Sequence, residues 1–298
     1  MSIILENDRL SLTIEPAAGG KISSLRNQRT GREWLWQNPH IAIEAKPYGT
    51  SYVEQLDSGG WDEIFPSVGP CQPDGWTIPD HGDLVSLPWA VISVTADRVE
   101  MSVDTRFADC RFSRVLHLDG NTLRAAYRLQ NKSAEKVPYL WCAHPLIAIE
   151  PGMQIVLPEG VSMRLDGGVN VPTVEPFSWP ALPGLTNIDM IPDVNAPDFK
   201  PFAAKMFTAA GAVAAVALRT ADGAESLRLN WDRKDAPFLG LWLNCRAWSG
   251  CGSAPYFNLG VEPATAPFDL LTDALAAGSG RWLGAGAVRE WEMTMCIE

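Results

Sequence analysis

Hydrophobic and polar residues alternate along much of the chain, a pattern typical of β-strands with one face buried and the other in water. In the first half, such runs cover residues 9–15, 91–97, 99–106, 111–119 and 122–131. Two of the breaks, Asp97-Arg98 and Asp119-Gly120-Asn121, are hairpin-length connections with turn-forming residues. The last four runs therefore predict an antiparallel meander whose apolar face packs against a second layer.

The same alternation continues in the second half of the chain. Runs with this pattern cover residues 154–157, 212–219, 226–231, 238–244, 257–261 and 288–297. Asp222-Gly223 predicts a hairpin turn between two of them. At residues 270–277 (LLTDALAA) we expect a short helix that is capped by Asp269 and ended by Gly278. The runs as a whole predict an all-β fold, a large antiparallel β-sandwich.

Residues 167–201 differ from the rest of the chain because they contain seven prolines. Loops of this length in compact folds are usually functional or packed over the core, so we expect an ordered loop here and not a flexible linker. We find no composition change that would mark a domain boundary. The sequence therefore predicts a single domain over residues 1–298.

Composition narrows the classes of partner. The 298-residue chain has a formal net charge of -11 and no run of lysine and arginine, which argues against nucleic acid or an anionic membrane as a partner. The N-terminal residues do not resemble a signal peptide, and the most apolar stretch, residues 211–218, is too short to span a membrane. The six cysteines show no CxxC spacing. We expect a cytoplasmic protein with reduced thiols, as a monomer or a homodimer.

Three side chains are candidates for acid–base chemistry. His81 lies in a turn bracketed by a proline and a glycine, and His144 ends a strand-like run before Pro145. Glu262 lies at a strand end before another proline. Strand ends and turns are where β-sandwiches present binding groups, so each is either functional or an ordinary residue at the rim. The other two histidines, at positions 40 and 117, are expected to be ordinary loop and strand residues.

A glycine-rich motif at residues 59–66 (GGWDEIFP) combines an aromatic side chain with two acids. Asp62 and Glu63 either bind sugar hydroxyls or bridge backbone amides, and a structural role is slightly favoured. Most of the twelve tryptophans are expected in the core, because aromatic side chains bury large areas. One or two at a rim would suit the apolar face of a pyranose, and Trp61 and Trp242 are the candidates.

Several short motifs, in this order, resemble the aldose 1-epimerase, or galactose mutarotase-like, superfamily. They are residues 19–25 (GGKISSL), 30–33 (TGRE), 59–66, 79–82 (PDHG), Trp89, 127–131, 141–145 (WCAHP) and 260–263 (GVEP). The resemblance implies a β-sandwich with its site on one concave sheet. It also implies that His144 is the acid, Glu262 the base and His81 a substrate-orienting residue. In that superfamily an aspartate binds substrate hydroxyls, and we suggest Asp189 for this role.

These residue types suit the interconversion of the α and β anomers of an aldose. A base removes the proton of the C1 hydroxyl while an acid protonates the ring oxygen, the ring opens, the aldehyde rotates, and the steps reverse. An imidazole and a carboxylate suffice near neutral pH, without metal or cofactor. The chain contains no dinucleotide-binding or P-loop motif. We therefore predict an isomerase of carbohydrate metabolism, an aldose 1-epimerase acting on a small-molecule sugar.

Two alternatives keep the same fold. A non-catalytic carbohydrate-binding or sugar-sensing protein would keep the cleft without needing His144 and Glu262. A hexose-6-phosphate 1-epimerase would need cations for the phosphate, and Lys21, Arg106 and Arg111 are candidates. The arginine-bearing N-terminal motif of typical galactose mutarotases is not visible here, which leaves the substrate open.

Two further alternatives use other carboxylates. A glycoside hydrolase needs two carboxylates that flank the bond, and Glu262 could pair with Asp62 or Asp83. A metal site could form from Asp80, His81 and Asp83, although no second histidine cluster accompanies them. The expected reaction itself requires no metal.

Overall fold

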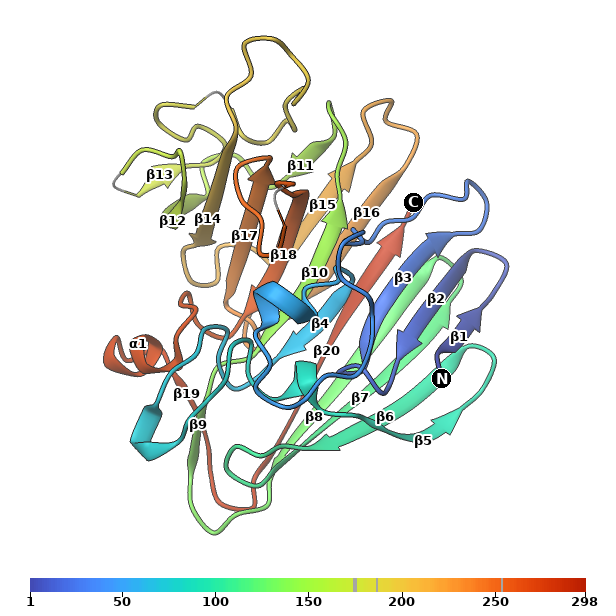
Figure 1. The fold of residues 1–298 in the computed structure, drawn as a ribbon, viewed down its shortest axis with the longest axis vertical. Coiled ribbons are helices and arrows are strands. Elements are labelled where there is room, and N and C mark those ends of the chain that lie inside the picture. Colours follow the sequence, from blue (N-terminus) through green and yellow to red (C-terminus); the bar gives the residue numbers. More distant parts are fainter. Residues whose placement is uncertain (174–175, 186, 253) are drawn as a thin grey trace.

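A computed structural model describes residues 1–173, 176–185, 187–252 and 254–298, which form two large antiparallel sheets stacked face to face (Figure 1). The larger sheet has ten strands in the order β1-β2-β3-β4-β10-β18-β17-β14-β12-β13. Their bounds are β1 (Ile3–Glu6), β2 (Leu10–Glu15), β3 (Lys21–Asn27), β4 (Trp61–Ile64), β10 (Cys142–Ala148), β12 (Ser162–Val169), β13 (Phe177–Ser178), β14 (Phe202–Thr208), β17 (Phe238–Cys245) and β18 (Phe257–Ala264).

The second sheet has eight strands in the order β11-β15-β16-β20-β8-β7-β6-β5. Their bounds are β5 (Ala90–Val94), β6 (Arg98–Asp104), β7 (Cys110–Asp119), β8 (Thr122–Asn131), β11 (Gln154–Val156), β15 (Ala215–Arg219), β16 (Ser226–Trp231) and β20 (Val288–Ile297). The remaining elements are the ribbon of β9 (Val137–Tyr139) and β19 (Arg281–Leu283), the π-helix η1 (Tyr52–Leu56), the 3-10 helices η2 (Pro73–Gly75) and η3 (Leu84–Ser86), and the helix α1 (Leu271–Ala276). Within the described ranges, no helix has the length and apolar character needed to cross a membrane.

The predicted all-β sandwich is confirmed, and so is the meander, because β5 to β8 lie side by side in chain order. The short helix predicted at 270–277 is present as α1, but its cap differs from the expectation. The N-cap position is occupied by Leu270 without a side-chain hydrogen bond, and Asp269 instead faces Lys205. All six cysteines are free thiols.

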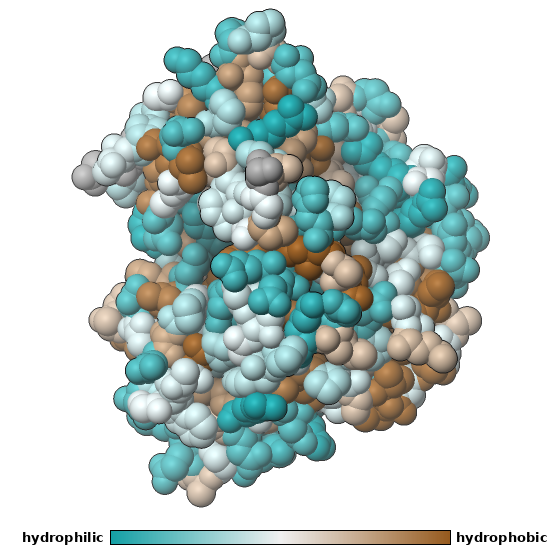
Figure 2. All heavy atoms as spheres, viewed as in Figure 1, coloured by the Kyte–Doolittle hydropathy of each residue, from teal (hydrophilic) through white to brown (hydrophobic). Residues whose placement is uncertain are grey.

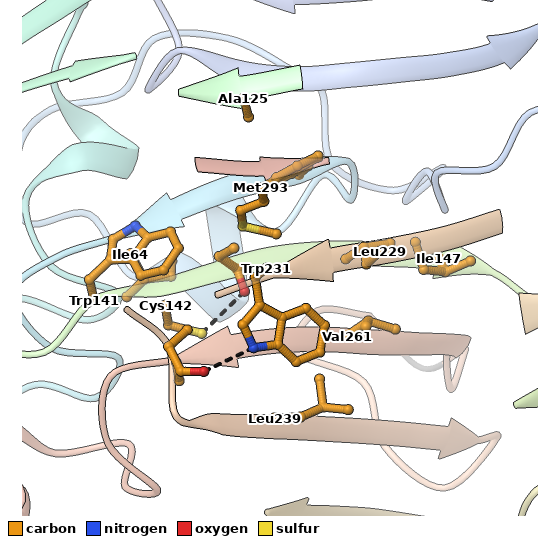
Figure 3. Packing of buried hydrophobic residues seen from close by; sticks show 14 of the residues in the cluster. Ile64, Ala125, Trp141, Cys142, Ile147, Leu229, Trp231, Leu239, Val261 and Met293 are labelled. Carbon is orange, nitrogen blue, oxygen red and sulfur yellow. Dashed lines mark hydrogen bonds between the residues drawn. The ribbon is translucent and has the colours of Figure 1, made fainter. Parts of the chain in front are cut away.

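The hydrophobic core lies between the two sheets. In Figure 3, Val261 and Leu239 of the ten-stranded sheet point toward Leu229 and Met293 of the eight-stranded sheet. Burial of apolar side chains, at roughly 25 cal/mol per Å² of surface removed from water, holds the layers together. Because side chains alternate along a strand, the residue after Val261, which is Glu262, projects from the outer face of the ten-stranded sheet.

A buried polar network crosses the core at β4. Glu63 accepts hydrogen bonds from the Tyr127 hydroxyl (2.8 Å) and the Trp141 indole (3.0 Å), and it pairs with Arg114 at 3.2 Å. Burial raises the pKa of the Glu63 carboxyl to about 7, although Arg114 and the hydrogen bonds act against that rise. Arg114 also donates to the carbonyl oxygen of Gly20. The network fixes β4 against β7 and β8, so Glu63 has a structural role.

Two central strands, β10 and β18, each contain a proline. The sequence analysis placed His144 and Glu262 at strand ends, because the prolines that follow them cannot donate to a β-ladder. Both residues instead lie inside their strands, and Pro145 and Pro263 continue those strands. The β10–β18 ladder is interrupted between the pairs Cys142–Ala264 and Leu146–Gly260, the stretch in which both prolines lie.

The proline-rich segment packs over the core, as expected for an ordered loop. Of its described residues, 167–169 complete β12 and 177–178 form β13. Its buried side chains include Trp179, Leu182, Ile188 and Ile191. The segment therefore extends the sandwich at one end.

Candidate active site

A cavity of about 250 Å³ opens on the outer face of the ten-stranded sheet. Side chains from β10, β14, β17 and β18 form its floor. Residues of η1, of the turn before η3 and of the connection between β17 and β18 cover it. Figure 2 shows one face of the molecule, on which hydrophobic side chains gather near the middle and hydrophilic side chains surround them.

His144 and Glu262 lie opposite each other on adjacent strands in this floor. Leu146 of β10 is paired with Gly260 of β18, which places His144 across from Glu262. The distance from His144 Nε2 to Glu262 Oε1 is 3.9 Å. Both are buried, with exposed fractions of 8% and 1%. Neighbouring strands lie about 4.8 Å apart, so the sheet itself fixes the separation of this pair.

Each member of the pair keeps one buried polar atom without a hydrogen-bond partner among the described residues, Nδ1 of His144 and Oε1 of Glu262. Such an atom costs about 1–3 kcal/mol when it is left unpaired, and at this cavity both atoms are available to a ligand. Burial lowers the pKa of His144 to about 4; Glu262 opposes this shift, and His81 and Lys205 reinforce it. The imidazole is therefore neutral near pH 7 and offers a ligand one N–H and one lone pair.

Lys205 of β14 is a site residue that the sequence analysis missed. Its ammonium group contacts Oε2 of Glu262 and lies 3.4 Å from Oδ1 of Asp269. Burial lowers the pKa of Lys205, but the two carboxylates outweigh burial and hold the pKa well above its ordinary value. The available signal was a single charge within the otherwise mostly apolar run 202–208 (FAAKMFT). Lys205 offsets the charge of Glu262 and leaves Oε1 of that residue for a ligand.

His81 lies in the cover of the cavity, in a turn where its backbone is left-handed (φ 58°). Residues other than glycine seldom adopt this conformation because it strains the backbone, and residues strained in this way are often found at functional sites. His81 Nδ1 is 2.8 Å from Asp80 Oδ1, and its ring stacks on Tyr52 with 3.7 Å between centroids. The ring centroids of His81 and His144 are 5.4 Å apart. Donation from Nδ1 to Asp80 leaves Nε2 of His81 as an acceptor.

The π-helix η1 is held over the cavity by two carboxylates. Asp80 accepts a hydrogen bond from the backbone N–H of Tyr52 at 3.1 Å. Although burial acts to raise it, the hydrogen bond from His81 holds the pKa of Asp80 below its ordinary value. Asp62 accepts from the Tyr52 hydroxyl (2.7 Å) and pairs with Lys21 (2.5 Å). Asp62 therefore supports Tyr52 and does not line the cavity itself.

Aromatic side chains form one wall of the cavity. Trp242, Trp248 and Tyr256 contact one another edge to face, with centroid distances of 5.7 Å and 5.6 Å. Trp242 is paired in the sheet with Gly260. A Cβ atom at Gly260 would lie 2.7 Å from Oε1 of Glu262, so only glycine leaves this carboxylate in place. The wall offers apolar ring faces beside polar groups, an arrangement that suits a ring-shaped polar ligand.

Besides Asp62, two residues suggested from the sequence do not line the cavity. Trp61 is 1% exposed and belongs to the core, because alternation along β4 points it inward with Glu63. Asp189 lies beside the edge of the eight-stranded sheet, where its carbonyl accepts from the N–H of Ile155 (2.6 Å). Neither is placed to bind a ligand in this cavity. The suggested residues that do line the cavity are His81, His144, Trp242 and Glu262.

The carboxylate of Asp83 is fully used by the fold. Its Oδ2 accepts from the backbone N–H groups of Arg106 and Phe107, both at 2.7 Å, and its Oδ1 accepts from the Tyr48 hydroxyl at 2.6 Å. It is not free to join a metal site or to act as the second carboxylate of a hydrolase. Across the part of the chain that the structure describes, no group of three or more histidine, cysteine or acidic residues is placed to hold a metal ion.

A larger, open groove of about 930 Å³ lies on the eight-stranded sheet. None of its described lining residues is a histidine, and its ion pair between Arg128 and Glu290 (3.5 Å) is exposed. Buried acid–base chemistry is therefore concentrated at the smaller cavity, on the opposite side of the sandwich.

Comparison with known proteins supports the assignment of the fold. No protein-family model matches the chain. A galactose mutarotase-like protein from Lactobacillus casei ATCC 334 is 15% identical with a TM-score of 0.66, and the match covers 100% of both chains. A galactose mutarotase related enzyme from Lactobacillus acidophilus is 17% identical with a TM-score of 0.69, covering 100% of this chain and 97% of that one.

A candidate aldose 1-epimerase from Escherichia coli K12 is 16% identical with a TM-score of 0.68, covering 100% of this chain and 99% of that one. Identities in this range establish a shared fold and not a shared activity. In this chain, two antiparallel sheets stack face to face, and a cavity opens on the outer face of the larger one. The chain therefore has the galactose mutarotase-like β-sandwich fold.

Proposed function

We propose that this protein is an aldose 1-epimerase, which interconverts the α and β anomers of an aldose. The observation that supports this function is the pair of His144 and Glu262, 3.9 Å apart in one cavity, each with an unpaired polar atom among the described residues. A carboxylate and an imidazole at this spacing can reach the two oxygen atoms bonded to one anomeric carbon.

Glu262 acts as the base in this proposal. Its Oε1 accepts the proton of the C1 hydroxyl, while Lys205 holds Oε2 and offsets the negative charge. Because only 1% of Glu262 is exposed, water does not compete for this oxygen. As the proton leaves, the C1 hydroxyl becomes a carbonyl and the bond between C1 and the ring oxygen breaks.

His144 acts on the ring oxygen. Its neutral imidazole donates an N–H to the negative charge that develops there, a role that other enzymes also give to neutral imidazole. The open-chain aldehyde then rotates about the bond between C1 and C2. The ring oxygen, an alkoxide stabilised by this N–H, attacks the other face of C1, and Glu262 returns its proton to the oxygen on C1, so no atom is gained or lost. Nε2 of His81 can accept a hydrogen bond from a sugar hydroxyl, and the Trp242 ring can pack against the face of the sugar ring.

The direct test measures anomer interconversion by NMR exchange or polarimetry with freshly dissolved aldoses. We expect the protein to accelerate equilibration beyond buffer catalysis. Glu262→Gln and His144→Gln should each lower the rate by about 100- to 10,000-fold, the usual range for one general acid or base. His117→Gln is the matched control, because His117 is a half-exposed residue that pairs with Asp97 on the other sheet.

Two outcomes would contradict the proposal. Full turnover by either variant at the cavity would remove that residue from the mechanism. Sugar binding without any acceleration by the wild type would instead indicate a carbohydrate-binding protein on the same fold. Circular dichroism of each variant checks that lost turnover does not result from unfolding.

A further inference from the structure

Asp57 is an acidic residue in the same cavity that the mechanism does not use. It follows directly after η1, is 5% exposed, and its Oδ1 has no hydrogen-bond partner among the described residues. Burial raises the pKa of Asp57 to about 6, while Lys21 and His81 act in the opposite direction. Its Oδ1 is therefore available to a hydrogen-bond donor on a ligand.

Asn258 is a second unpartnered polar side chain in the cavity. It is 1% exposed, and its Oδ1 also has no partner within the described part of the chain. On β18 it precedes Glu262 by four residues, so the two lie on one face and about 13 Å apart along the strand. Gly260 between them carries no side chain, which leaves the floor open. A sugar with C1 at Glu262 and its ring along β18 would present its remote substituents to Asn258.

The cavity carries an excess of negative charge. Its described lining includes the carboxylates of Asp57, Glu262 and Asp269. The ammonium group that faces them, Lys205, already contacts Glu262 and Asp269. A phosphate group entering the cavity would meet these carboxylates without an uncommitted lysine or arginine among the described lining residues.

The cations that the sequence suggested for phosphate lie elsewhere. Lys21 is held by Asp62 at 2.5 Å, beneath η1. Arg111 pairs with Asp104 at 2.8 Å on the other sheet, and Arg106 lies over the ring of a tyrosine outside the cavity. None of the three lines the cavity.

We infer that Asp57 and Asn258 form a subsite for hydroxyl groups of the sugar remote from C1, and that the cavity takes an unphosphorylated sugar. The inference rests on the proposed function for the direction in which the sugar lies. Two acceptors without partners among the described residues match hydroxyl donors, and the carboxylates that line the cavity disfavour an anionic substituent.

The test uses ligands that cannot mutarotate, 1,5-anhydro-D-glucitol and 1,5-anhydro-D-galactitol, which lack the C1 hydroxyl. Affinity is measured by calorimetry or by the fluorescence of the tryptophans in the wall. We expect at least one of the two anhydrohexitols to bind the wild type. Asp57→Asn and Asn258→Leu should each weaken the affinity for that compound by about 10-fold or more, which is the loss expected from one missing hydrogen bond of this kind. Asp189→Asn, on the other sheet, is the control and should bind as the wild type does.

Charged analogues complete the test. The 6-phosphate of the preferred anhydrohexitol should bind the wild type at least about 10-fold more weakly than the neutral compound, and Asp57→Asn should narrow that gap. The inference is overturned if neither neutral anhydrohexitol binds, or if Asp57→Asn and Asn258→Leu both bind it as tightly as the wild type does. It is also overturned if the 6-phosphate binds as tightly as the neutral anhydrohexitol. A fourth probe is the 2-amino analogue of the preferred anhydrohexitol, and binding far tighter than that of the parent compound would likewise overturn the inference. Normal binding with no acceleration of free aldoses would remove the epimerase proposal and keep the subsite.

Discussion

The buried imidazole of His144 should make folding stability depend on pH in a predictable direction. Its pKa in the folded protein is about 4, against 6.5 for an ordinary histidine. Between these values the unfolded chain binds a proton that the folded protein does not, so the free energy of unfolding must fall as the pH drops. The stabilising contribution is complete above about pH 6.5 and is lost progressively toward pH 4.

The size of the effect follows from the two pKa values. At about 1.4 kcal/mol per pKa unit, the whole shift corresponds to about 3 kcal/mol, of which about 2 kcal/mol is lost between pH 7 and pH 5. Asp57 and Glu63 act in the opposite direction, because burial raises their pKa values and favours the folded state at low pH. The free energy of unfolding of the wild type therefore contains contributions that rise with pH and contributions that fall with pH.

A comparison of variants isolates His144. Urea unfolding of the wild type and of His144→Gln, measured at about pH 7 and pH 5, should show a wild type that loses about 2 kcal/mol more than the variant. The buried carboxylates are common to both proteins, so their contributions cancel. Equal losses in the two proteins would refute the reasoning, since His144 would then bind protons equally well when folded and unfolded.

Two further predictions concern the surroundings of Glu262. Gly260→Ala should lower the rate of mutarotation by about 10-fold or more, because the new Cβ would lie 2.7 Å from the Glu262 carboxylate. Gly167→Ala is the control and should leave the rate unchanged, because a Cβ at this position meets nothing within 4 Å. Polarimetry compares the two, and an unimpaired Gly260→Ala would show that the carboxylate need not occupy its present position. Lys205→Met should cost about 3–5 kcal/mol of stability in urea unfolding, because it strands a buried carboxylate, and Lys205→Arg should recover much of that loss. Equal stability of Lys205→Met and the wild type would mean that Lys205 does not compensate Glu262.

Strands with one face in water could be read from the sequence, and so could β17 and β18, but three other strands that are buried on both faces could not. The strands β6, β7, β8 and β20 show clear alternation because one side of each meets solvent, whereas β5 is exposed along its whole length. Most residues of β4, β10 and β14 are buried whichever way they point, since the covering segments shield the outer face of the ten-stranded sheet. Their apolar runs therefore carry no period-2 signal.

The candidate site was predictable where a residue type is rare and its neighbours are distinctive. His81, His144 and Glu262 lie next to glycine or proline and were named for that reason. Lys205 and Asp57 were missed because a single lysine or aspartate is common in any sequence, and only the fold brings them to the cavity. The aromatic candidate at position 61 was wrong because one step along a strand exchanges the cavity face for the core.

The placement of the acid–base pair on two neighbouring strands has a consequence for how this scaffold can change. Backbone geometry sets the spacing of the pair, while the residues that would meet the rest of a ligand come largely from connecting segments: η1, the turn before η3, and the link between β17 and β18. Exchanging these segments would alter which ligand is held without rebuilding the reacting centre. Specificity and chemistry can therefore diversify independently in this architecture, and loop grafting is the natural route to redesign it.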